Sequence, residues 1–301
     1  MYAFLQNVIN GLALGGVYAL VALGYTMVYG ILQFINFAHS EIFMVGAFAG
    51  LFLAGFLAGV LPPAALLATV MLGSMLCCMA VGVLAERLAY RPLRSAPRLN
   101  VLITAVGVSL LLQNLGQIVF GATPRVFPSV IETTQYHPIA GSDLVLTNIQ
   151  ILVILVSAAL VLGLTFLVQK TKLGTAMRAV SFDFEVASLM GIATDRVIVF
   201  TFLIGSSLAG CAAVLYGLCY PKIEPMMGVW IGMKAFVAAV FGGIGSLAGA
   251  AVGGLVLGLA ESFTVYYVSS TFRDAIAFAL LILVLLFRPS GLFGVTRKEK
   301  V

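Results

Sequence analysis

Lysine and arginine are absent from the first 86 residues, and the only acidic residues there are Glu41 and Glu86. Charged residues make up 9% of the whole chain and hydrophobic residues 62%, with a mean hydropathy of +1.14. Soluble domains carry roughly 25% charged residues, and they could not hide so much apolar surface from water. The composition therefore excludes a soluble domain with a single anchor. It predicts an all-α fold, a polytopic transmembrane helical bundle that forms one domain over residues 1–301.

Other features are missing as well. The four cysteines, Cys77, Cys78, Cys211 and Cys219, lie in apolar runs without CxxC spacing or clustered histidines, so we expect neither disulfides nor a metal site. The net charge of +5 comes without a basic stripe interleaved with aromatic residues, so we expect no nucleic-acid partner. The N-terminus lacks the basic region of a signal peptide, so the first apolar stretch is expected to remain as a span.

Motifs of common enzymes are not found either. The chain has no G-x-x-x-x-G-K-[ST] loop that could cradle nucleotide phosphates, no H-E-x-x-H and no paired carboxylates. We therefore expect a protein that is not an enzyme and that binds no cofactor of its own.

The basic residues that are present fall mainly into three clusters. These hold twelve of the 16 lysines and arginines: Arg87, Arg91, Arg94 and Arg98; Lys170, Lys172, Arg178 and Arg196; Arg288, Arg297, Lys298 and Lys300. Positively charged loops of membrane proteins are retained in the cytoplasm. The clusters therefore predict the cytoplasmic side and a cytoplasmic C-terminus.

Apolar stretches long enough to cross a bilayer, which takes about 20 residues, predict eight or nine membrane segments. They cover residues 5–30, 34–58, 64–85, 99–120, 148–168, 197–219, 232–247, 249–268 and 273–287. Because the first two clusters are both inside, the loop 121–147 between them is expected outside, as is 220–231. The loop has turn-forming and acidic residues: Pro124, Pro128, Pro138, Gly141 and Asp143. The N-terminus is outside if three full spans precede Arg87, and inside if one of them is re-entrant.

A glycine-rich stretch lies near the C-terminal third of the chain. Its small residues recur at short spacing: Gly242, Gly243, Gly245, Gly249 and Gly253. In lipid, small residues let helix backbones approach closely. Tight packing within the chain and an interface between subunits are both consistent with the pattern. Residues 242–246 could also form a turn, since 232–268 is too long for one span.

The cytoplasmic segment 169–196 is too polar for a span, yet it has few turn formers between Thr175 and Met190. Its apolar residues could line one side of short helices, with a helix stop at Gly191. Such a segment could dock an apolar face into a partner's groove. The alternative is an ordinary loop lying on lipid headgroups.

A second polar stretch interrupts an apolar region at Asn36, His39, Ser40 and Glu41. Polar groups at membrane depth tend to face a cavity or a partner. Asn36 and Ser40, four residues apart, are expected on one helix face. With Asn114, these residues are our candidates for a translocation pathway; the alternative is an interfacial turn with His39 and Glu41 in headgroup water. Other polar residues within spans more often join helices than bind solute; they are Gln113, Gln117, Lys234, Glu261 and Asp274.

Several motifs together resemble one family. The run from Glu185 to Gly191 resembles the EAA-x-x-x-G pattern of ABC-importer permeases, with Val186 at its second position. The wider block resembles the branched-chain amino acid ABC permeases. It consists of Gly174, Arg178 and Ala179, then Gly191 and Ile192, then Asp195, Arg196 and Val197.

Further blocks of the same family follow in order. Residues 36–41 resemble its Asn-Phe-Ala-His-Gly-Glu signature with Ser40 in place of glycine, 236–254 its glycine-rich block, and 288–294 its closing motif. The similarity extends from about residue 5 to 294, and the compact length fits the H-type permease.

The resemblance implies an importer subunit in a bacterial cytoplasmic membrane. Its ATPase-coupling loop would contain Arg178, Ala179, Glu185, Ala187, Gly191 and Ile192. The implied partners are a homologous second permease subunit, two cytoplasmic ATPase subunits that bind ATP, and a periplasmic solute-binding protein. The implied cargo is leucine, isoleucine or valine; other amino acids, urea or short amides remain alternatives within the family. An ion-coupled secondary transporter is the alternative outside it.

Overall fold

The computed structural model describes residues 2–94, 96–137 and 144–294. Three residues of the predicted external loop, Pro138, Gly141 and Asp143, lie outside the described residues. So do Arg297, Lys298 and Lys300 of the third basic cluster.

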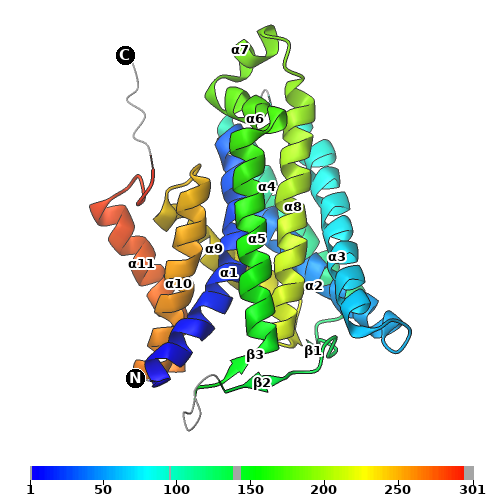
Figure 1. Cartoon of the computed structure of the whole chain (residues 1–301). Coiled ribbons are helices and arrows are strands. Elements are labelled where there is room, and N and C mark those ends of the chain that lie inside the picture. The colour runs from blue at the N-terminus through cyan, green and yellow to red at the C-terminus, as the bar shows by residue number, and fades with distance from the viewer. Residues whose placement is uncertain (1, 95, 138–143, 295–301) are drawn as a thin grey trace.

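Helices make up most of the described chain (Figure 1). Eight of them are long and apolar enough to cross a membrane, counting short helical extensions of α3 and α11, and α9 is a shorter apolar helix. The membrane helices are α1 Tyr2–Leu32, α2 Ala38–Leu57, α3 Pro63–Ala85, α4 Arg98–Phe120, α5 Asn148–Lys170, α8 Thr194–Cys219, α9 Met227–Gly242, α10 Leu247–Tyr267 and α11 Arg273–Phe287. The short helices are α6 Lys172–Phe182 and α7 Phe184–Leu189; single turns are η1 Glu86–Tyr90, η2 Arg91–Leu93 and η3 Ser270–Phe272. The predicted all-α bundle of eight or nine membrane segments is confirmed.

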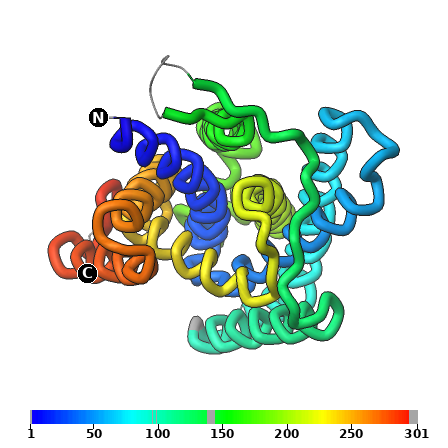
Figure 2. The backbone as a smooth tube through the Cα atoms, turned by 90° about the horizontal axis from the view of Figure 1, so that it is seen from below, coloured from blue at the N-terminus to red at the C-terminus, as the bar shows by residue number. Residues whose placement is uncertain are grey.

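Helix α1 runs into the middle of the bundle, with α5, α8 and α10 packed around it (Figure 2). Glycines on different sides of α1 permit this close packing of neighbouring helices. A Cβ at Gly11 or Gly15 would lie 2.8 Å from a Cα of α10, and one at Gly16 would collide with Ser157 of α5. Small residues thus let two helices, α5 and α10, approach the α1 backbone closely, which supplies packing contacts in place of a hydrophobic driving force.

The glycine-rich stretch packs within the chain. Gly242 and Gly249 meet backbone to backbone, Gly253 meets Ala238, and a Cβ at any of them would collide. Helix α9 ends at Gly242 and α10 begins at Leu247, so the predicted turn at 242–246 is confirmed. Gly243 and Gly245 adopt φ values of 105° and 96°, which side chains other than glycine rarely tolerate.

Short paired strands close one end of the bundle, and α6 and α7 project from the other (Figure 1). Strand β1 (Arg125–Val126) pairs antiparallel with β4 (Lys222–Ile223), and β2 (Gln135–Tyr136) pairs with β3 (Leu146–Thr147). The two segments predicted to lie outside therefore contact each other. The start of α1 lies at this same end (Figure 1), where Gln6 accepts a hydrogen bond from the backbone of Val145 at 2.9 Å.

Candidate functional site

The segment between α5 and α8 begins each of its short helices with a side-chain cap. The hydroxyl of Thr171 accepts a hydrogen bond from the backbone N–H of Gly174 at 3.1 Å, which starts α6. The carboxylate of Asp183 accepts from the N–H groups of Glu185 and Val186 at 3.0 and 2.9 Å, which starts α7. These bonds satisfy the donors that a helix start leaves free, so the segment is ordered backbone and not a flexible linker.

The end of α7 depends on one glycine. After Leu189 the chain reaches Gly191, whose φ is +82°, and its N–H donates to the carbonyl of Ser188. The next N–H, of Ile192, donates to the carbonyl of Ala187. This is the left-handed helix ending that glycine favours. The predicted helix stop at Gly191 is confirmed.

Helix α7 presents apolar side chains outward from the bundle. Leu189 is 86% exposed and Met190 79%, and Val186 is exposed as well. Ala187 is buried and faces back toward the protein, and Glu185 is exposed. The tip of α7, by which we mean Val186, Leu189 and Met190, is thus an apolar surface at the end of the molecule, as an interaction site requires.

The other predicted coupling residues lie around this tip. Arg178 and Gly191 are exposed, and Ala179 and Ile192 are partly buried. They belong to α6 and to the connection between α7 and α8, so the fold brings all six predicted coupling residues to one end of the bundle.

An ionic cluster joins the start of α8, just after the α7 segment, to the connection between α3 and α4. Asp195 binds Arg91 at 2.8 Å and also binds Arg94, and Arg94 in turn binds Glu86. Glu86 is fully buried, whereas the Asp195 side chain is about half exposed. These four residues are called the Asp195 cluster below.

The polar stretch before and within α2 lies in the protein interior. Helix α2 begins at Ala38, so Asn36 precedes it, and the expected shared helix face of Asn36 and Ser40 is wrong. The Asn36 side chain instead accepts a hydrogen bond from the Tyr90 hydroxyl at 2.6 Å. Ser40 donates to the carbonyl of Phe37 at 2.7 Å.

His39 and Glu41 are buried against neighbouring helices. Their exposed fractions are 1% and 0%, and a buried nitrogen of His39 and a buried oxygen of Glu41 have no hydrogen-bond partner. The alternative that placed them in headgroup water is therefore wrong. Asn114 lies elsewhere, exposed on α4, with its amide donating to the carbonyl of Leu110. The fold brings the other four candidates together but separates Asn114 from them.

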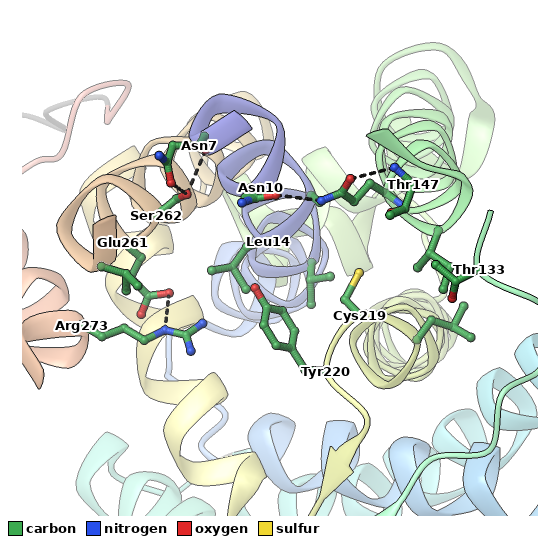
Figure 3. Close-up of a pocket in the computed structure, with 16 residues that line it drawn as sticks. Asn7, Asn10, Leu14, Thr133, Thr147, Cys219, Tyr220, Glu261, Ser262 and Arg273 are labelled. Atoms are coloured by element: carbon green, nitrogen blue, oxygen red, sulfur yellow. Dashed lines mark hydrogen bonds and ion pairs between the residues drawn. The ribbon is translucent and has the colours of Figure 1, made fainter. Parts of the chain in front are cut away.

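A cavity of about 520 Å³ opens near the strand-bearing end, between α1, α5, the end of α8, α10 and α11. Its lining is mixed (Figure 3): polar residues Asn7, Asn10, Thr133, Thr147, Gln150, Tyr220, Glu261, Ser262 and Arg273, and apolar residues that include Leu14, Val17, Ile149 and Leu218. Small-molecule sites occupy roughly 300–1,000 Å³ and combine an apolar wall with a few polar groups. None of the five predicted pathway residues lines this cavity.

A second ionic cluster forms one side of the cavity. Buried Glu261 binds Lys234 and accepts a hydrogen bond from the Tyr18 hydroxyl at 2.7 Å. Lys234 also binds Asp274 at 2.7 Å, and Arg273 approaches Glu261 at 3.5 Å. We call Lys234, Glu261, Arg273 and Asp274 the Glu261 cluster.

Lys234 joins α9 to α10, as the sequence favours, since its side chain is 9% exposed and ion-paired with Glu261. Burial raises the pKa of Tyr220, beside Arg273, so its hydroxyl keeps its proton at neutral pH. The only signal for this site in the sequence was the presence of opposite charges in different spans.

Comparison with known proteins adds the family. The family model "Branched-chain amino acid transport system / permease component" matches residues 7–285. The chain is 43% identical to a high-affinity branched-chain amino acid transport system permease protein, LivH of Salmonella typhimurium, over 99% of this chain and 98% of that one. It is 41% identical to BraD of Pseudomonas aeruginosa, a permease protein of the same description, over 100% and 99% of the two chains. A probable LivH of Methanocaldococcus jannaschii is 30% identical over 93% and 89%.

The membrane helices and these matches together define a multi-pass membrane permease, a transport protein and not an enzyme. The chain belongs to the family of branched-chain amino acid transport permeases.

Proposed function

We propose that the chain is the H-type permease subunit of an ATP-binding-cassette importer that carries branched-chain amino acids across a bacterial inner membrane. The observation that carries the proposal is full-length similarity to LivH and BraD, which are named as high-affinity permeases for this cargo. Urea, short amides or other amino acids remain alternative cargoes.

The tip of α7 supports docking to an ATPase subunit. Its apolar residues are exposed, but the backbone beneath them is held by the Asp183 cap and by the Gly191 ending. Because the tip of α7 is rigid and apolar, it can bind in a groove on a partner without a large loss of conformational entropy. In this proposal the α7 end and the C-terminus face the cytoplasm, and the strand-bearing end faces a periplasmic solute-binding protein.

A second, homologous permease subunit completes the proposed assembly, together with two ATPase subunits. Helices α4, α5 and α11 leave much of their apolar surface uncovered, with Ile118 at 79%, Leu162 at 70% and Leu286 at 72% exposed. Such surfaces suit lipid and a partner helix bundle equally in composition. In this proposal the second permease subunit covers part of this apolar surface and lipid covers the rest.

Substitution of Gly191 tests the docking. Tryptophan cannot adopt the positive φ without strain, so Gly191→Trp should distort the end of α7. Loss of an interface anchor costs about 2 kcal/mol or more, near thirtyfold in affinity. We expect the ATPase subunits to co-purify poorly with Gly191→Trp, and ATP-driven leucine uptake in proteoliposomes to fall in parallel, while membrane insertion stays normal.

The matched control is Gly191→Asn, because asparagine tolerates the left-handed conformation better than other residues. This variant should keep ATPase binding and most of the uptake. Unchanged co-purification and uptake in Gly191→Trp would overturn the docking assignment. A thiol introduced at Leu189 provides the orientation test: labelling from outside intact cells would reverse the proposed topology and remove the ATPase from this surface.

A further inference from the structure

The cavity beside the Glu261 cluster lies far from the docking tip, at the strand-bearing end (Figures 1 and 3). It is formed by a single copy of the chain. Its apolar lining includes Leu14 and Val17 of α1 and Leu218 of α8. The guanidinium of Arg273 and the carboxylate of Glu261 also line the cavity, together with amide and hydroxyl groups.

The charges of the Glu261 cluster are unequally satisfied. One oxygen of Glu261 binds Lys234, the other accepts the hydrogen bond from Tyr18, and Lys234 has Asp274 as a second partner. Arg273 reaches Glu261 only through Nε, at 3.5 Å, and this buried nitrogen forms no hydrogen bond. Glu261 is therefore already engaged by its neighbours, whereas the two terminal nitrogens of the Arg273 guanidinium bind no other member of the cluster.

The position of Arg273 makes that capacity available to a solute. Its side chain is one-third exposed, the guanidinium stands 5.5 Å from the centre of the Tyr220 ring, and Figure 3 shows it directed toward the middle of the cavity. A guanidinium presents paired N–H donors that match the two oxygens of a carboxylate. Stacking over an aromatic ring would hold it in place for such a contact.

We propose that this cavity is a binding site for an aliphatic amino acid, with its carboxylate on Arg273 and its side chain against Leu14, Val17 and Leu218. Neutral polar groups of Asn7, Asn10 and Thr133 also line the cavity and offer acceptor oxygens to an ammonium group, so the site suits a zwitterion. This inference rests on the proposed function, because it places the cargo of that transporter inside one subunit. This arrangement selects solutes that carry both a carboxylate and an apolar side chain small enough for the cavity.

Cys219 provides a native reporter, since it also lines the cavity (Figure 3). The experiment uses the purified transporter with its ATPase and permease partners but without the binding protein. A small methanethiosulfonate reagent labels Cys219, and the Cys219→Ala variant measures the background from the other three cysteines. We expect leucine to slow the labelling in a saturable manner, and leucinamide, which lacks the carboxylate, to have no effect at the same concentration.

Substitution of the arginine extends the test. Loss of a charged hydrogen bond corresponds to roughly a tenfold or greater loss of affinity. In Arg273→Gln the leucine concentration for half-protection should rise by that factor or more, and Arg273→Lys should recover part of the loss. The matched control is Arg125→Gln, which removes an arginine from the same end of the molecule but from outside the cavity. It should leave protection unchanged.

Equal protection by leucine and leucinamide, protection by neither, or protection that survives Arg273→Gln would each overturn the site. So would a complete lack of Cys219 labelling without ligand even in alkaline buffer, where the thiolate that the reagent attacks is more abundant, since the cavity would then be closed to small molecules. ATP-driven leucine uptake, measured with the binding protein on the same preparation, separates the two hypotheses. Uptake without protection removes the site and leaves the proposed function, and absence of leucine uptake removes the function.

Discussion

The two ionic clusters have the same number of charges of each sign, but they lie at opposite ends of the bundle. Each contains two cations and two carboxylates, and each has one carboxylate that is fully buried and one that is about half exposed. In the Asp195 cluster these are Glu86 and Asp195, and in the Glu261 cluster Glu261 and Asp274. The first joins helix ends and connections near α7, and the second joins α9, α10 and α11 beside a cavity.

The difference lies in how the buried carboxylate is held. Glu86 has Arg94 as its ion-pair partner, and one of its buried oxygens forms no hydrogen bond. Glu261 has three neighbours that donate to it or pair with it: Lys234, Tyr18 and Arg273. The same four charges thus make a connection between segments at one end of the bundle. At the other end, the charges of the Glu261 cluster stabilise one another beside the cavity, and Arg273 remains able to contact a solute.

The largest effect is expected for Glu261→Gln. Removing this charge leaves Lys234 buried with only the exposed carboxylate of Asp274, and breaking a buried ion pair typically costs about 3–5 kcal/mol. We expect a marked loss of stability of the detergent-solubilised protein in thermal or denaturant unfolding. Glu132→Gln, which neutralises an exposed carboxylate at the same end, is the control. Stability equal to that of the control would mean that the cluster contributes little to the fold.

A smaller effect is expected for Glu86→Gln. Arg94 keeps Asp195 as a partner after the substitution and is partly exposed to water, so little charge is left uncompensated. Loss of one charged hydrogen bond corresponds to about 1.5–3 kcal/mol. The same unfolding measurement should rank this variant between the control and Glu261→Gln. A loss equal to or above that of Glu261→Gln would reverse the comparison between the clusters.

The sequence predicts the helices well because span length and hydropathy are local properties. The expected spans 64–85 and 99–120 differ by one residue from α3 and α4. The stop at Gly191 and the turn at 242–246 follow equally from glycine chemistry. The start of α2 was misplaced because Phe34, Ile35 and Phe37 continue the apolar run through a break that has no proline or glycine.

The cavity was not predictable in this way. Its lining comes from helices that are far apart in the chain, such as α1 and α11. The pairing of Lys234 with Glu261 depends on how α9 crosses α10, and periodicity within either helix carries no information on that crossing. The sequence showed only that charges of both signs occur in the last spans. Similarly, the separation of Asn114 from Asn36 depends on which face of α4 is turned toward the bundle.

A third prediction concerns Asp195→Asn. The carboxylate is half exposed and solvent screens it, so the loss of stability should be about 1 kcal/mol or less. Its two arginine partners connect the start of α8 to the segment between α3 and α4. A displacement of α7 would therefore be transmitted to that segment through these ion pairs. We therefore expect fewer leucine molecules transported per ATP hydrolysed, with little change in unfolding. A matched control is Glu224→Gln, which breaks an exposed pair with Lys222 at the opposite end. An unchanged transport ratio in Asp195→Asn would show that the cluster is structural only.

The smallest effect is expected for Asp274→Asn. This carboxylate is half exposed like that of Asp195, but its partner Lys234 is already neutralised by buried Glu261. Exposed pairs contribute about 0.2–1 kcal/mol, and salt reduces that further because the Debye length falls from about 10 Å at 0.1 M to 3 Å at 1 M. The variant should unfold within a few degrees of the unmodified protein, and the difference should shrink in high salt. A loss of stability as large as that of Glu261→Gln and independent of salt would contradict this prediction. Asp274 would then stabilise the fold as much as buried Glu261 does, and the Glu261 cluster would need both of its carboxylates.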